Sequence, residues 1–401
     1  MKRSGNADMP LHGGKVPYWL AGRMAKLGGA ITEAVVLEYG RSEFLRRLSD
    51  PLWFQAFGAV LGMDWHSSGI TTSVMGALKK SINPISSSLG IFICGGRGKH
   101  SRKTPDELLS LAEKVGFDGD VMVKNSKLSA KVDNTAIQDG YQLYLHSFVV
   151  TTEGEWVVVQ QGMNQTNGMA RRYHWHSPGI RSFTENPHSG VCGLNKGPIL
   201  NLTAPEAKPA KEGIMNISRE EPDLMMKEIR KIILPRHHDV RKEDVNLKRL
   251  GSVLALANSG KINTFDDLLM VNGLGPRTLQ SLTLVSEVIH GTPSRFNDPA
   301  RYSFAHGGKD GHPFPVPTKV YDETMHVLKT SVERAKIGQS DKQKAVKSLH
   351  DLAVRMEKNF KPDPDRFEKI LEKERSDSYK YGGRTVFGKS KPPGGQLDLF
   401  G

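Results

Sequence analysis

Apolar residues recur with helical spacing in the first part of the chain. Between residues 15 and 39 they fall three or four positions apart, which predicts an amphipathic helix that ends at Gly40. The same spacing continues to residue 82, with an interruption at residues 49–51 (Ser-Asp-Pro) that separates a second helix from a third. Because several aromatic residues share this pattern, we expect these helices to pack around a common core.

From residue 89 the pattern changes to that of strands. An apolar run at residues 89–94 is bounded by glycines and predicts a buried strand. Residues 141–150 and 156–160 are rich in β-branched and aromatic side chains and flank a loop containing Gly154, which predicts an antiparallel hairpin. Residues 171–176 are a candidate third strand.

The pattern divides the chain into five parts and predicts an α+β fold. Residues 1–202 combine helices with a small mixed or antiparallel sheet, and residues 203–215 have the composition of a linker. An all-α region follows at 216–318, apart from a Gly/Pro-rich stretch at 291–317. Charged helices at 319–337, 340–358 and 364–375 make a C-terminal extension to residue 387, either packed on the rest or exposed as a hairpin. A tail spans 388–401.

The net charge of the chain indicates what kind of molecule it binds. The 401 residues include 56 Lys and Arg against 43 Asp and Glu, a net charge of +13. Such a surface favours a polyanion, either nucleic acid or an anionic membrane. The N-terminus lacks the apolar run of a signal peptide, no apolar stretch is long enough to span a bilayer, and only two cysteines occur. We therefore expect a cytoplasmic, nucleoid-associated protein that does not enter membranes.

Residues 264–282 resemble the helix-hairpin-helix of repair and recombination proteins. Gly273 and Gly275 flank Leu274 in a turn that permits a sharp reversal and close approach to a phosphate. Arg277 and Thr278 follow at the start of the second helix, where the N–H groups and helix dipole favour an anion and the two side chains would add contacts to a phosphate. The resemblance implies sequence-independent binding of the DNA backbone. The alternative is an ordinary αα-corner, since Leu279 and Gln280 occupy positions where the family commonly has a small residue.

A second basic segment follows the first predicted strand. Residues 95–103 (Gly-Gly-Arg-Gly-Lys-His-Ser-Arg-Lys) have no glycine at the spacing that an ATP-binding Walker motif requires. Arg97 and Lys99 are better interpreted as contacts to a phosphate backbone. A solvated loop is the alternative.

The centre of the chain resembles metal-dependent nucleases of the restriction-endonuclease type. In those enzymes acidic groups bind Mg²⁺ and a lysine orients water. The candidate metal ligands for Mg²⁺ or Mn²⁺ are Asp133, Asp139 and Gln160, and Glu155 and Lys131 complete the candidate catalytic set. The pattern departs from that family because no lysine follows Gln160. Carboxylates beside turns are also common as caps, so whether the protein is an enzyme stays open.

Histidines form further clusters without a complete ligand set. His174 and His176 alternate on one predicted strand, His237 and His238 are adjacent, and a third group combines His306 and His312 with Asp310. Alternating histidines can share a metal. No additional ligand is spaced to complete any of these sites, so the interpretation without a metal is favoured.

The tail resembles the peptide by which many bacterial replication and repair proteins bind the sliding clamp. Leu397, Leu399 and Phe400 offer apolar anchors, and Gln396 offers an amide for hydrogen bonds. The preceding residues 388–395 contain no apolar side chain and two prolines, which is typical of a tether. The alternative is that the tail folds back on its own domain.

Most of residues 1–320 resemble an uncharacterised family of bacterial and archaeal proteins known only as a domain of unknown function. The segments that carry this resemblance are 10–15, 45–54, 64–69, 101–105, 131–134, 138–144 and 159–163. It implies no activity. The motifs together predict a DNA repair or recombination protein, either a metal-dependent nuclease for branched, nicked or single-stranded DNA or a non-catalytic adaptor. Oligomeric state and a role in RNA binding are left open.

Overall fold

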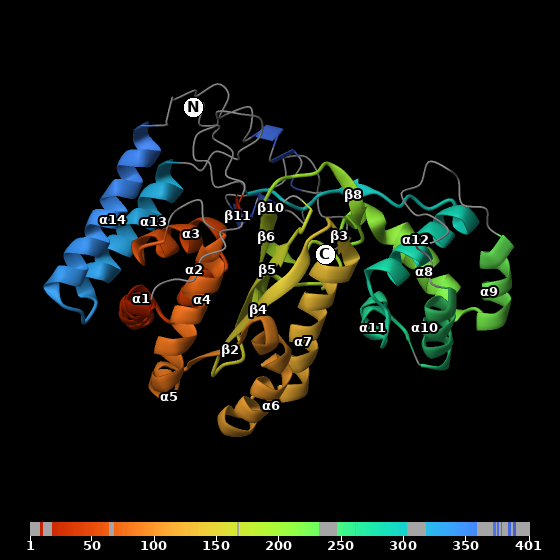
Figure 1. The fold of residues 1–401 in the computed structure, drawn as a ribbon, viewed down its shortest axis with the longest axis horizontal. Helices are drawn as coiled ribbons and strands as arrows, with labels where there is room; N and C mark the ends of the chain where they lie inside the picture. Colours follow the sequence, from red (N-terminus) through yellow and green to blue (C-terminus); the bar gives the residue numbers. More distant parts are fainter. Residues whose placement is uncertain are drawn as a thin grey trace, which may run out of the picture.

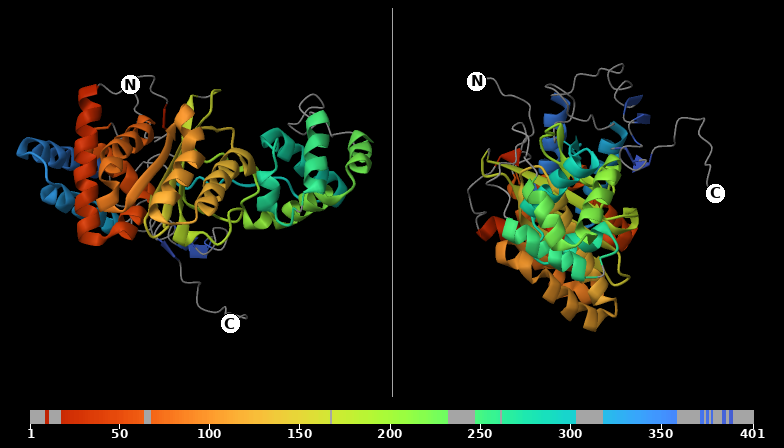
Figure 2. Two further views of the ribbon diagram at one scale, coloured as in Figure 1. Left: turned by 90° about the horizontal axis from the view of Figure 1, so that it is seen from below. Right: turned by 90° about the vertical axis from the view of Figure 1, so that its right-hand side faces the viewer.

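A six-stranded antiparallel sheet stands between two groups of helices. The computed structural model describes residues 9–10, 18–63, 68–166, 168–231, 247–260, 262–302 and 318–358, with short pieces at 372–373, 375–376, 378, 384–385 and 388–389. The helices of residues 18–89 lie at the left of Figure 1 and those of residues 208–290 at the right, and the turned view in Figure 2 agrees. The fold is therefore α+β with a small antiparallel sheet, as the sequence predicts.

The central sheet is built around the predicted hairpin. Its strand order is β1-β6-β5-β4-β2, and β7 also pairs with β6. The strands are β1 (Met9–Pro10), β2 (Ile91–Arg97), β4 (Gln142–Thr151), β5 (Trp156–Met163), β6 (Met169–His176) and β7 (His188–Cys192). Val157 pairs with Val149 and Val158 with Phe148, and both pairs are buried. Successive side chains point to opposite faces, so a continuous apolar run indicates that both faces are covered.

The N-terminal helices cover one face of the sheet. They are α1 (Tyr18–Tyr39), α2 (Arg41–Leu48), α3 (Pro51–Val60), α4 (Gly69–Ile82) and the short α5 (Ser86–Leu89). Their apolar side chains pack with Ile91, Val149 and Val159. The chain returns to this core in α13 (Thr318–Arg334) and α14 (Gln339–Lys358), through Leu328 and Leu349. The predicted helices at 319–337 and 340–358 thus pack on the rest.

The opposite face carries the second helical group. It contains α6 (Thr104–Val115), α7 (Gly119–Lys131), α8 (Lys208–Arg219), α9 (Pro222–Lys231), α10 (Leu247–Ser259), α11 (Phe265–Met270) and α12 (Pro276–His290). Their core includes Phe148, Val158 and Trp175 from the sheet. A small three-stranded sheet of β3 (Ile137–Gln138), β8 (Pro198–Asn201) and β9 (Phe296–Asn297) lies beside it. A further pair, β10 (Arg384–Thr385) and β11 (Gly388–Lys389), lies near the C-terminus.

The predicted linker at 203–215 is wrong. These residues form a short 3-10 turn, η5 (Pro205–Ala207), and most of α8. Ala207, Ala210 and Ile214 are fully buried against α12 and its neighbours. The prolines that suggested a linker stand instead at the beginnings of helical turns, where a missing N–H leaves no hydrogen bond unmade.

Candidate functional site

The segment that resembles a helix-hairpin-helix forms two helices joined by a tight turn. A capping box begins α11: Thr264 Oγ1 accepts a hydrogen bond from Asp267 N (3.2 Å), and Asp267 Oδ2 accepts one from Thr264 N (3.1 Å). The chain reverses at Gly273, whose φ of 85° favours glycine. Leu274 is 1% exposed and fills the space behind the turn. Gly275 then leads into α12.

The N-terminus of α12 is open to the surroundings. Gly275 has extended backbone, and a Cβ added there would meet no atom within 4 Å. Pro276 is the first residue of the helix, and the N–H groups of Arg277 and Thr278 have no carbonyl one turn before them in the helix. The Arg277 side chain is exposed, whereas that of Thr278 is 7% exposed. Position 278 therefore offers a ligand its backbone rather than the expected side-chain hydroxyl.

The turn is fastened to the end of α7. Lys131 Nζ donates a hydrogen bond to the Leu274 carbonyl (2.6 Å), and Gln138 Nε2 donates one to the Pro276 carbonyl (2.7 Å). Both carbonyls flank Gly275, so these bonds fix the direction in which the open helix end faces. Lys131, the candidate water-orienting lysine, thus contacts the hairpin.

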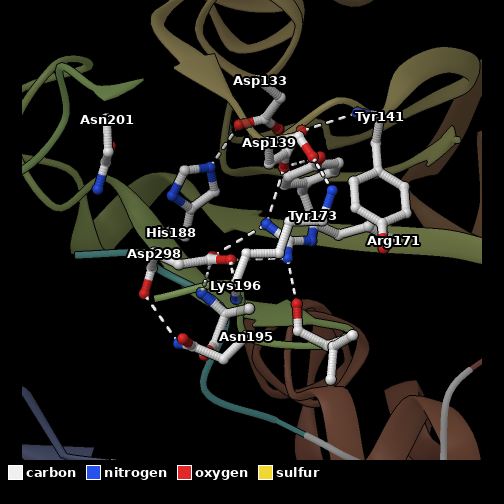
Figure 3. A network of polar contacts seen from close by, with 12 residues as sticks. Asp133, Asp139, Tyr141, Arg171, Tyr173, His188, Asn195, Lys196, Asn201 and Asp298 are labelled. Atoms are coloured by element: carbon white, nitrogen blue, oxygen red, sulfur yellow. Dashed lines mark hydrogen bonds and ion pairs between the residues drawn. The ribbon is translucent and has the colours of Figure 1, made fainter. Parts of the chain in front are cut away.

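Asp133 lies in a π-helical turn, η3 (Val132–Ala136), directly after α7. Its Oδ2 accepts hydrogen bonds from Trp175 Nε1 (2.8 Å) and from the Gln160 amide, and its Oδ1 lies 2.5 Å from His188 Nε2. The carboxylate is completely buried (Figure 3). Buried carboxylates require such partners, because loss of hydration is otherwise costly.

A relay of buried polar groups extends from Asp133 across the sheet. Gln160 Oε1 lies 2.7 Å from His146 Nδ1, and His146 Nε2 lies 2.9 Å from Ser126 Oγ. Because the amide oxygen can only accept, His146 Nδ1 carries the proton and Nε2 accepts from the serine. Burial lowers the pKa of His146, which favours this neutral form. The order resembles a serine–histidine relay, but Ser126 is only 3% exposed, so its hydroxyl is closed to a substrate.

Asp139 belongs to a neighbouring ion cluster on the same face (Figure 3). Its Oδ2 accepts from Arg171 Nη1 (2.9 Å) and Tyr173 Oη (2.6 Å), and its Oδ1 accepts from Tyr141 N (3.0 Å). The Arg171 guanidinium also binds Asp298 through two N–H groups (2.9 and 2.8 Å). Burial raises the pKa of Asp139, and the charge of Arg171 opposes that effect.

The five candidate nuclease residues do not converge on one point. Asp133 and Gln160 are in direct contact, and Asp139 lies in the adjacent cluster. Glu155, however, binds Ser42 (2.5 Å) and His176 (2.8 Å) on the face covered by the N-terminal helices. Both oxygens of each aspartate already accept hydrogen bonds. This arrangement does not fit a bound Mg²⁺ or Mn²⁺ ion, which needs free carboxylate oxygens.

The sequence does not predict the residues that surround Asp133 and Asp139 in the two buried clusters. Trp175 and Tyr173 alternate along β6, a segment that the sequence marks as a strand. Their alternation with buried polar residues is a signal that could have been used. His188 and Asp298 carry no comparable signal, because they approach from β7 and from the loop after β9.

The basic loop after β2 forms the 3-10 turn η2 (Gly98–Lys103). Arg97 and Lys99 are exposed, as a phosphate contact requires. The Arg97 guanidinium carbon lies 5.9 Å from the centre of the Tyr144 ring. The loop therefore exposes its cationic side chains to solvent within residues 95–103, the basic segment found in the sequence.

The histidine clusters separate in the fold. His174 Nε2 accepts a hydrogen bond from Arg172 Nε (2.7 Å) in the core, whereas His176 pairs with Glu155. His237, His238, His306, Asp310 and His312 lie outside the described residues, as do the tail residues Gln396, Leu397, Leu399 and Phe400. Within the described ranges no group of three or more His, Cys, Asp and Glu side chains is arranged to hold a metal ion.

Comparison with known proteins identifies a family. A family profile described as "Protein of unknown function (DUF763)" matches residues 5–316. No curated protein and no solved structure matches the chain. Among the helices that the structure describes, none has the length and apolar character to cross a membrane.

Proposed function

The chain belongs to the DUF763 family of proteins of unknown function. Since that description names no activity, we propose from the residues themselves that the protein binds the DNA backbone as a non-catalytic adaptor. The hairpin of residues 264–282 is the DNA-binding element. The C-terminal peptide, from Gln396 to Phe400, attaches the protein to a bacterial sliding clamp.

One observation carries the proposal: the unobstructed N-terminus of α12 directly after a Gly-Leu-Gly turn. A phosphate group can approach the backbone at Gly275 because no side chain stands there. The unpaired N–H groups and the positive end of a 15-residue helix dipole then favour the anion. The exposed Arg277 adds a charge-assisted contact. These contacts address phosphate and not bases, so binding without sequence preference is expected.

The buried state of the central carboxylates favours the adaptor over the nuclease. Asp133 is 0% exposed and Asp139 is 2% exposed, and protein donors occupy their oxygens. A nuclease would need these groups to face a metal and a scissile phosphate. Cleavage of branched, nicked or single-stranded DNA remains the second candidate function, because Asp133 and Gln160 do meet as that hypothesis expects.

The test is a comparison of two glycine variants in DNA binding. Gly275→Val places a branched side chain in the phosphate approach, and the extended backbone there accepts valine without strain. The matched control is Gly338→Val, because Gly338 also precedes a helix and also has open space around its Cβ. Fluorescence anisotropy with a labelled duplex should show binding at least 10-fold weaker for Gly275→Val and unchanged for the control.

The same DNA panel, incubated with Mg²⁺ or Mn²⁺, separates the two functions. Binding without cleavage supports the adaptor. Metal-dependent cleavage by the wild type that is lost in Asp139→Asn would establish the nuclease instead. Equal affinity of wild type and Gly275→Val would show that the hairpin does not bind the backbone.

A further inference from the structure

A row of lysines follows α7 toward the hairpin. Lys124, Lys127 and Lys131 are three and four positions apart, so they lie on one side of the helix. Lys124 and Lys127 are exposed, and in the part of the chain that the structure describes neither forms an ion pair with a carboxylate. We call these three residues the α7 lysine row.

Such a row is unfavourable for the helix alone. Like charges three or four positions apart repel and cost about 0.2–0.5 kcal/mol for each pair. The only acidic residue of α7 is Asp120, in the first turn, so the last two turns carry positive charge without internal compensation. Asp266 and Asp267 of α11 offset part of this charge at Lys124, and a polyanion bound along this side would remove the remaining repulsion.

The row runs beside the hairpin and ends at it. Lys124 lies close enough to Asp266 and Asp267, at the start of α11, to influence both carboxyl groups. Lys131 donates to the Leu274 carbonyl, one residue before Gly275. Helices α7 and α11 are therefore side by side and run in the same direction, because Lys124 lies near the start of α11 and Lys131 contacts the turn that follows it. The lysine row leads directly to the open end of α12.

We propose that Lys124 and Lys127 bind successive phosphates of the DNA strand whose backbone is held at Gly275. This inference rests on the proposed function and extends its site from one helix end to a linear track. With a rise of 1.5 Å per residue, the row is about 10 Å long. Phosphates follow one another about every 3.4 Å along the axis of one strand, so the row spans about three of them. DNA therefore lies along α7 when it enters the hairpin.

The salt dependence of binding tests the track. In Lys124→Gln/Lys127→Gln, two phosphate contacts are lost, so the slope of log affinity against log salt should decrease by about 1.8 for duplex DNA. The same relation gives about 30-fold weaker binding at about 0.15 M salt. The control is Lys26→Gln/Lys336→Gln, which removes the same charge from exposed lysines in the N-terminal helical group and after α13.

The outcomes distinguish the track from the hairpin. An unchanged slope in the α7 variant, with binding still weakened by Gly275→Val, would overturn the track and leave the proposed function standing. An equal decrease in both double variants would mean that only net charge matters, which also overturns the track. If the wild type does not bind DNA, both proposals are wrong.

Discussion

At the scale of single residues, the two aspartates that the sequence marks as metal ligands are buried and bound by protein donors. Sequence motifs mark Asp133 and Asp139 because carboxylates near turns and strands are typical of metal sites. In the fold each carboxylate is surrounded by donors, from Trp175 and His188 in one case and from Arg171 in the other. Fully paired buried charges hold neighbouring elements in one arrangement, and removing one partner leaves the others unpaired.

We expect Asp133→Ala to lower the free energy of unfolding by about 3–5 kcal/mol, because the Trp175 and Gln160 donors would remain buried without their acceptor. Urea unfolding followed by circular dichroism measures the change. The control is Glu113→Ala at an exposed position of α6, for which we expect a change within about 0.5 kcal/mol. A stable Asp133→Ala protein that loses metal-dependent cleavage would instead identify Asp133 as catalytic.

At the scale of elements, small residues decide how closely helices pack. A Cβ added at Gly213 of α8 would lie 2.1 Å from Ser286 Oγ of α12, so the two helices touch through this glycine. The sequence predicts a linker here from the composition of the segment, which includes two prolines and a glycine. In a helix the same small side chains permit close contact, and the apolar residues between them complete the core.

Two Gly→Ala variants test this interpretation. Gly213→Ala should lower the free energy of unfolding by about 1–3 kcal/mol, because the added methyl group overpacks the contact with Ser286. Gly76→Ala in α4 has open space and should raise it by up to about 1 kcal/mol through helix propensity. Thermal unfolding of both proteins measures the difference. Stabilisation by both variants would show that α8 and α12 are not in close contact.

At the scale of the whole molecule, one sheet joins two helical groups, each with its own hydrophobic core. The N-terminal helices and the returning α13 and α14 form a core on one face. The other face carries α7, with the exposed Lys124 and Lys127, and the hairpin. We propose that clamp recruitment is left to the tail, so the two binding functions rest on different residues.

This separation predicts that loss of the clamp contact leaves DNA binding intact. Leu399→Ala/Phe400→Ala removes two apolar anchors and should weaken binding to a purified bacterial sliding clamp by at least 10-fold, since each anchor is worth about 1.5–3 kcal/mol when buried. Surface plasmon resonance on immobilised clamp measures this affinity, and anisotropy with duplex DNA is the control. Equal clamp affinity of the variant and the wild type would remove the tail from the proposal.

The sequence by itself determined the local features of this protein: most of its helices, although not α7 and α8, the β4–β5 hairpin, the turn at Gly273 and the overall α+β class. These follow from spacing, turn chemistry and capping, which act over a few residues. Only the tertiary structure decided which charged residues are buried. The groups that surround Asp133 and Asp139 come from β6, β7 and the loop after β9. Arg171 binds both Asp139 and Asp298, which are 159 positions apart in the sequence. Contacts over such separations depend on how the strands and helices assemble, and no local pattern encodes them.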